Sequence, residues 1–131
     1  LPVANEAALK FKETAGLHAE AFSIAEVAHG PMTLIGPGDP VLVFGPGDAA
    51  REGLADRVAD FAAREAMVIG SGEAADLAGA ALRLPTAVNA QPPIDAIARI
   101  QSFYRLANAL ALARGRDPDH PPHLAKVTRT L

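Results

Sequence analysis

The chain has 131 residues, half of them hydrophobic, which is enough for one domain with a hydrophobic core. Its formal net charge of −3 offers no basic surface for nucleic acid or anionic lipid, and it has no cysteine for a disulfide or a thiolate metal site. No apolar run reaches the roughly 20 residues of a membrane helix, and no signal peptide is visible. We therefore expect a cytoplasmic protein that binds neither nucleic acid nor membrane.

The first predicted element is a helix over about residues 4–14 that stops at Gly16. Glu6, Lys10 and Glu13 are spaced by four and then three residues, so a helix places them on one face. Such carboxylate and ammonium groups can move protons on a small polar substrate. Taken alone, the same residues also fit an ordinary ion pair and a solvated carboxylate at a helix end.

A second helical stretch is predicted at about 24–27, just before His29 in a His-Gly-Pro turn. A histidine in such a turn is more often a turn or capping residue than a catalyst, although its ordinary pKa suits proton transfer. We expect His18 and Glu20 to be structural and Lys12 to be solvated.

Short apolar runs then alternate with helical segments along the chain. Buried strands are predicted at 41–44 and 66–69, and a third strand candidate lies at 81–84. Helices are predicted from an N-cap at Asp48 to about Glu65, at 73–78, and from about Pro93 to Arg114 before Gly115. The last helix has an apolar face that includes Ile94, Ile97 and Phe103. This alternation predicts an α/β protein with a mostly parallel sheet in a three-layer sandwich.

Two segments about a hundred residues apart carry a family resemblance. The N-terminal wording EAALKFKE with HAEAFSIAEVAHGP and the tail DPDHPPHLAKVTRTL resemble the second half of the sugar isomerase (SIS) proteins, which bind and isomerise phosphosugars. The resemblance implies a doubly wound, flavodoxin-like sheet. It also implies a single C-terminal SIS domain over 1–131, with an extended tail at about 116–131. Because a central strand before the first helix is missing, we expect a fragment of a longer two-SIS protein.

The resemblance implies aldose–ketose isomerisation of an amino-sugar phosphate. The wording of the two segments is closer to the deaminase group, which converts glucosamine-6-phosphate to fructose-6-phosphate and ammonia. The alternative is the isomerase domain of glutamine-dependent glucosamine-6-phosphate synthase. A second alternative is a non-catalytic, phosphosugar-binding regulatory domain, but retention of all the reactive groups favours an enzyme.

Particular residues match the family's site. The resemblance implies that Glu13 shuttles a proton between C1 and C2, that Lys10 steadies the enediolate, and that Glu6 orients substrate or Lys10. It implies that His29 opens the sugar ring in the active site of a neighbouring subunit, which predicts a homodimer. It places Lys126 over the sugar, where the matching lysine of the synthase forms a Schiff base. No cofactor and no metal are implied.

The expected partners are a sugar phosphate and an N-terminal SIS half that supplies the phosphate loop. Gly70-Ser71-Gly72-Glu73 follows a predicted strand, but it lacks the Ser/Thr-rich wording of that loop. His120 and His123 match no standard zinc spacing, so we expect them to belong to a stiff, proline-rich tail.

Overall fold

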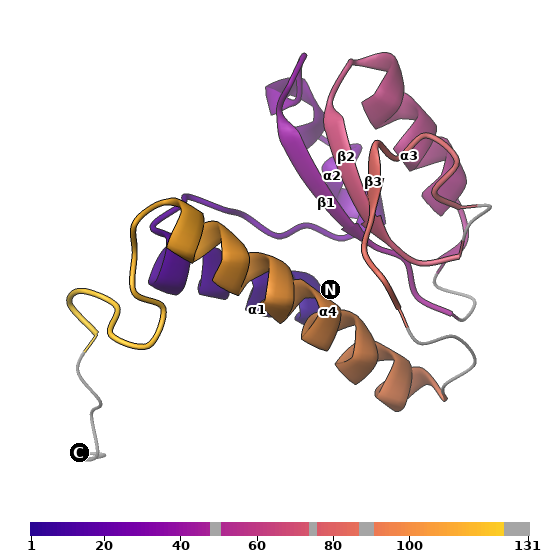
Figure 1. The fold of residues 1–131 in the computed structure, drawn as a ribbon. Coiled ribbons are helices and arrows are strands. Elements are labelled where there is room, and N and C mark those ends of the chain that lie inside the picture. The colour runs from indigo at the N-terminus through magenta and orange to yellow at the C-terminus, as the bar shows by residue number, and fades with distance from the viewer. Residues whose placement is uncertain (48–50, 74–75, 87–90, 125–131) are drawn as a thin grey trace, which may run out of the picture.

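The computed structural model describes residues 1–47, 51–73, 76–86 and 91–124. Within them, β1 (Pro40–Phe44), β2 (Met67–Ser71) and β3 (Leu82–Arg83) form a sheet in that order, with every pair parallel (Figure 1). All three strands lie at the predicted places, although β3 is shorter and β2 continues through Gly70 and Ser71. The predicted parallel α/β sheet is confirmed.

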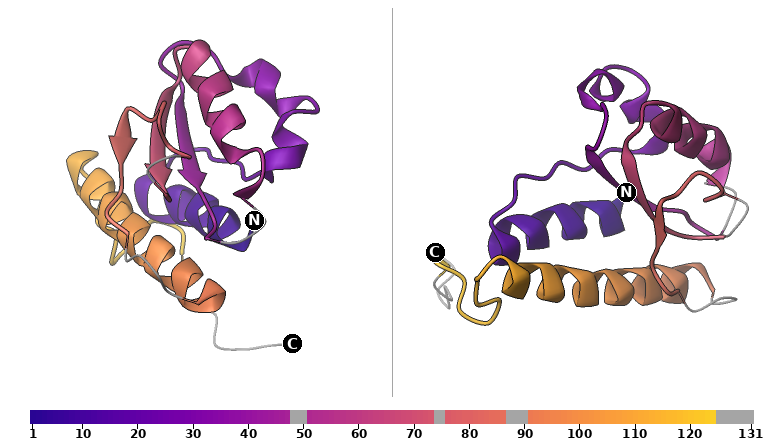
Figure 2. Two further views of the ribbon diagram at one scale, coloured as in Figure 1. Left: turned by 90° about the vertical axis from the view of Figure 1, so that its right-hand side faces the viewer. Right: turned by 45° about the horizontal axis from the view of Figure 1, so that its top comes forward.

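Helices cover both faces of this sheet (Figure 2). On one face lie α1 (Pro2–Lys10), its π-helical continuation η1 (Phe11–Ala15) and the long helix α4 (Pro92–Ala113). On the other face lie α2 (Ile24–Val27), the 3₁₀ turn η2 (Pro31–Leu34) and α3 (Leu54–Ala63). The three layers expected from the alternating pattern are therefore present.

Two hydrophobic cores follow from the alternation of side chains along the strands. Val43 and Val68 point into the core that α2, η2 and α3 cover. Leu42 and Phe44 point the other way, toward Phe103 of α4 and the α1 layer. Phe103 is fully buried, and its ring meets Phe11 edge-on with 4.9 Å between the ring centroids. This second core fixes the position of the helix that carries the charged residues.

Two predicted helices differ from the structure. The helix predicted from Asp48 begins only at Leu54, because Gly53 precedes it in the left-handed conformation with φ 76°, which interrupts a helix. Asp48 itself lies outside the described residues. In place of the helix predicted at 73–78, residues 76–79 form a turn.

The apolar face of α4 also differs from the prediction. Ile94 and Ile97 are 57% and 64% exposed, whereas Asp95 and Arg99 on the same helix are buried. The Arg99 guanidinium makes two hydrogen bonds to the Asp95 carboxylate, at 2.6 Å from Nε and 2.9 Å from Nη2. Because each group neutralises the other, this i,i+4 pair can be buried where the pattern suggested isoleucine.

Candidate functional site

The N-terminal helix presents the charged groups of the site. It begins with Pro2 in its first turn, which suits a helix start, and it passes from α-helical to π-helical geometry after Lys10. Gly16 ends it with φ 60°, a conformation that glycine adopts without strain. Arg114, just beyond α4, donates from Nε to the Ala15 carbonyl at 2.9 Å, so the helix end is tied to the neighbouring helix. Short π-helical turns occur frequently at functional sites.

Glu6, Lys10 and Glu13 lie in one line along this helix, as predicted. Lys10 Nζ donates to Glu13 Oε2 at 2.7 Å, while Glu6 Oε1 is 3.9 Å from the same nitrogen. The hydrogen bond to Glu13 raises the pKa of Lys10, and the charges of both glutamates act in the same direction. The tighter pair is thus Lys10–Glu13. Lys10 remains a cation at neutral pH.

These three side chains are half-buried. Their exposed fractions are 35% for Glu6, 33% for Lys10 and 24% for Glu13. A small polar molecule can therefore reach them while they keep their mutual contacts. A carboxylate can accept a proton from carbon, and an adjacent ammonium can stabilise the negative charge that this step leaves on oxygen. The arrangement is suited to proton transfer next to a carbonyl group.

A fourth polar group belongs to this line, and the sequence analysis did not predict it. Tyr104 of α4 donates from its hydroxyl to Glu6 Oε1 at 2.9 Å. The two residues are 98 positions apart, so no local spacing could join them. The only signal was the helical pattern, which placed Tyr104 beside Phe103 on the long helix.

His29 lies in the other layer of the molecule. It follows α2, whose N-terminus is closed by a capping box in which Ser23 and Glu26 bond each other's backbone N–H. Because α2 and η2 pack on the opposite face of the sheet from α1, the structure does not bring the exposed His29 together with Glu13 in one chain. His18 and Glu20 are exposed as well, with 3.9 Å between His18 Nε2 and Glu20 Oε1.

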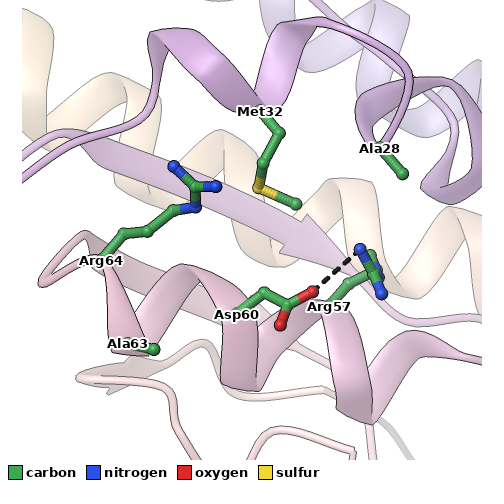
Figure 3. A pocket seen from close by; sticks show the side chains of 6 residues that line it. All are labelled: Ala28, Met32, Arg57, Asp60, Ala63 and Arg64. Carbon is green, nitrogen blue, oxygen red and sulfur yellow. Dashed lines mark ion pairs between the residues drawn. The ribbon is translucent and has the colours of Figure 1, made fainter.

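A shallow pocket of about 460 Å³ opens beside the His29 turn, between that turn and α3. Figure 3 shows Arg57 and Asp60 of α3 joined by an ion pair of 2.8 Å across from Met32. The pocket is lined by six residues: Ala28, Met32, Arg57, Asp60, Ala63 and Arg64. The pocket thus belongs to the α2–α3 layer, away from the helix that bears Glu13.

The glycine-rich segment 70–73 begins within β2, and its one hydroxyl, that of Ser71, is not free for a phosphate. Ser71 is fully buried, and its Oγ shares a hydrogen bond of 2.8 Å with Thr86 Oγ1. Gly72 packs closely against Gly45 of the neighbouring strand end. This segment is therefore part of the sheet's packing.

The tail begins next to the charged helix. The guanidinium of Arg116 lies over Gly16, where a side chain at that glycine would collide with it. Farther on, His120 Nδ1 lies 2.9 Å from Asp117 Oδ2, and this hydrogen bond raises the pKa of the imidazole. Lys126 lies outside the described residues. Among residues that the structure does describe, no group of three or more His, Asp or Glu side chains is placed to hold a metal ion.

The fold agrees with the comparison to protein families. The family model described as "SIS domain" matches residues 1–110, so the chain belongs to the SIS domain family. None of the helices described here is long and apolar enough to cross a membrane.

One curated relative and two solved structures show which members of the family this chain is similar to. A glutamine–fructose-6-phosphate aminotransferase (isomerizing) of Leifsonia xyli subsp. xyli is 39% identical over 95% of this chain. A solved putative phosphosugar isomerase of Silicibacter pomeroyi is 44% identical, with a TM-score of 0.76 over 89% of this chain and 35% of its own. A solved glucosamine-6-phosphate deaminase of Thermotoga maritima is 28% identical, with a TM-score of 0.73 over 95% of this chain and 35% of its own. The chain spans 21% of the length of the aminotransferase of Leifsonia xyli subsp. xyli.

Proposed function

We propose that this chain is the C-terminal SIS domain of a longer cytoplasmic enzyme that isomerises an amino-sugar phosphate, interconverting glucosamine-6-phosphate and fructose-6-phosphate with release or uptake of ammonia. The observation that carries the proposal is the contact of 2.7 Å between Lys10 and Glu13, half-buried beside Glu6. Relatives named for an aminotransferase, a deaminase and a phosphosugar isomerase support this substrate class.

Isomerisation moves a proton between C2 and C1 of the open-chain sugar. In the proposed step, Glu13 takes the proton from C2 of open-chain glucosamine-6-phosphate as the C–H electrons form a C1–C2 double bond and negative charge develops on O1. Glu13 then returns the proton to C1 while a proton from the nitrogen passes to O1 and the C2–N bond becomes an imine. Water hydrolyses this imine to the ketone of fructose-6-phosphate and ammonia; the reverse sequence makes the amino sugar. The cationic Lys10 stabilises the intermediate charge, and Glu6 orients the substrate or Lys10. This assignment needs no cofactor.

His29 is proposed to open the sugar ring in the site of a neighbouring subunit. Its exposed turn on the layer opposite Glu13 supports a role across a homodimer interface, since one chain does not join the two residues. An imidazole can pass a proton between the ring oxygen and solvent.

The His29→Asn variant tests this role. It is expected to lower kcat on the cyclic sugar phosphate by about 10²-fold, the lower end of the usual contribution of one general acid–base group, because ring opening loses its proton carrier. An open-chain analogue should react at a rate within about twofold of wild type, since that substrate skips the lost step. Steady-state kinetics on both substrates measure this difference. Equal losses on the two would contradict the role.

Lys126 and a phosphate-binding loop complete the proposed site. Lys126 is proposed to lie over the substrate, and the contact of Arg116 with the end of the Glu13 helix supports this by bringing the start of the tail beside that helix. The phosphate is proposed to bind a loop of an N-terminal SIS half, because Ser71 is occupied by Thr86. Within the described residues, no strand pairs with the outer edge of β1, which supports a further segment against the sheet.

The nitrogen chemistry is decided by one assay of the complete protein. Glucosamine-6-phosphate and fructose-6-phosphate are each incubated with the enzyme, with and without ammonia or glutamine, and the sugars and ammonia are quantified. Ammonia release from glucosamine-6-phosphate indicates the deaminase, whereas glutamine-dependent formation of it indicates the aminotransferase. The curated relative favours the second outcome. Binding without turnover would contradict the proposed function and indicate a regulatory domain.

A further inference from the structure

Tyr104 is the feature of the site that the proposed chemistry does not yet use. It is the only tyrosine in the chain, and it stands on α4 facing the charged side of α1. Its hydroxyl donates to Glu6 Oε1, the same oxygen that lies 3.9 Å from Lys10 Nζ. The tyrosine therefore holds the oxygen that faces the lysine.

Glu6 depends on this hydroxyl for its position. Lys10 gives its hydrogen bond to Glu13, and at 3.9 Å it attracts Glu6 without a hydrogen bond of its own. Among the described residues, Tyr104 is the one hydrogen-bond donor to the Glu6 carboxylate. A half-buried glutamate without it has several rotamers of similar energy.

The helix that bears Tyr104 is held rigidly against the site. Phe103, its neighbour, is fully buried and meets Phe11 of η1 edge-on. At the far end of the same helix pair, the Arg114 guanidinium bonds the Ala15 carbonyl. A hydroxyl placed by an element fixed at both points can set a partner's position closely.

The hydroxyl is also in the right protonation state to donate. Its hydrogen bond to Glu6 raises the pKa of the phenol, and burial acts in the same direction. Tyr104 therefore remains a neutral donor over the pH range in which sugar isomerisation would proceed.

We infer that Tyr104 is a positioning residue for the proton-transfer site: it fixes Glu6 beside Lys10, so that Glu6 faces the substrate in one orientation. The inference rests on the proposed function for its consequence in catalysis. The hydrogen bond itself, from α4 to Glu6, can be tested without turnover.

The kinetic test replaces Tyr104 by phenylalanine in the complete protein. We expect kcat to fall about tenfold, with KM within about twofold of wild type, because the ring is kept and one hydrogen bond to a charged group is lost. Ser102→Ala is the matched control, since it removes another hydroxyl from α4, one that bonds the Pro85 carbonyl. That control is expected to keep wild-type kcat. In a Glu6→Ala background, Tyr104→Phe should cause no further loss of kcat.

The second test measures the ionisation of the Tyr104 phenol directly. The ultraviolet absorbance change on alkaline titration, taken as wild type minus Tyr104→Phe, isolates Tyr104 in the complete protein. We expect its midpoint above the ordinary value of about 10, and we expect Glu6→Ala to lower it. A midpoint that Glu6→Ala leaves unchanged would overturn the hydrogen bond.

The outcomes distinguish a failure of the Tyr104 positioning role from a failure of the proposed function. Wild-type kcat in Tyr104→Phe, or a further tenfold loss when it is added to Glu6→Ala, would overturn the positioning role and leave Tyr104 as a packing residue. A wild type that turns over neither sugar contradicts the proposed function, and in that case the titration alone decides whether Tyr104 holds Glu6.

Discussion

Replacing Glu13 by glutamine is expected to lower kcat for the interconversion of glucosamine-6-phosphate and fructose-6-phosphate by about 10²–10⁴-fold. The amide keeps the size of the carboxylate and can still accept a hydrogen bond from Lys10, but it cannot take a proton from carbon. KM should therefore stay within about twofold of wild type, since substrate contacts are largely retained. Initial rates over a range of substrate concentrations measure both constants.

Glu20→Gln is the control for this variant. Glu20 is an exposed carboxylate seven residues farther along the chain, and its Oε1 lies 3.9 Å from Nε2 of the exposed His18. The same change of charge there should leave kcat at the wild-type value. Similar losses in the two variants would show that overall charge, and not proton transfer at Glu13, is responsible.

Replacing Phe103 by alanine is expected to lower the free energy of unfolding by about 3–5 kcal/mol. The side chain is fully buried and sits at the centre of the core between the sheet and the helices α1 and α4. Its ring meets Phe11 and Phe44 edge-on, with centroid distances of 4.9 and 6.0 Å. The cavity would therefore open directly behind the helix that carries Glu13.

Urea unfolding and hydrogen exchange of the α1 and α4 amides measure this loss. Leu112→Ala on the exposed side of the same helix is the control, and it should change the free energy of unfolding by no more than about 0.5 kcal/mol. If both variants unfolded at the same urea concentration, the assignment of Phe103 to the core would be wrong.

The first helix and its charged face could be predicted because they depend on local spacing alone. Glu6, Lys10 and Glu13 must share a face of any helix, and the structure confirms it. The choice of Glu13 as the closer partner of Lys10 could not be predicted. Nor could the hydrogen bond from Tyr104 to Glu6, which joins residues 98 positions apart.

The strands were equally predictable, because short continuous apolar runs bounded by glycine and proline are typical of buried strands. The start of α3 was not, since Asp48 is a good N-cap by its residue type, whereas the left-handed Gly53 delays the helix. The burial of Asp95 and Arg99 could not be predicted either. Only the geometry of the pair allows two charges to occupy a core position.

Exchange of solvent deuterium into C1 of fructose-6-phosphate, followed by proton NMR in D₂O with the complete protein, tests the central claim most directly. This exchange reports proton transfer at carbon whatever the source of nitrogen. We predict exchange with the wild type and a rate lower by at least about 10²-fold with Glu13→Gln. A wild type that binds the sugar without exchanging it, or a Glu13→Gln variant that exchanges at the wild-type rate, would contradict the account.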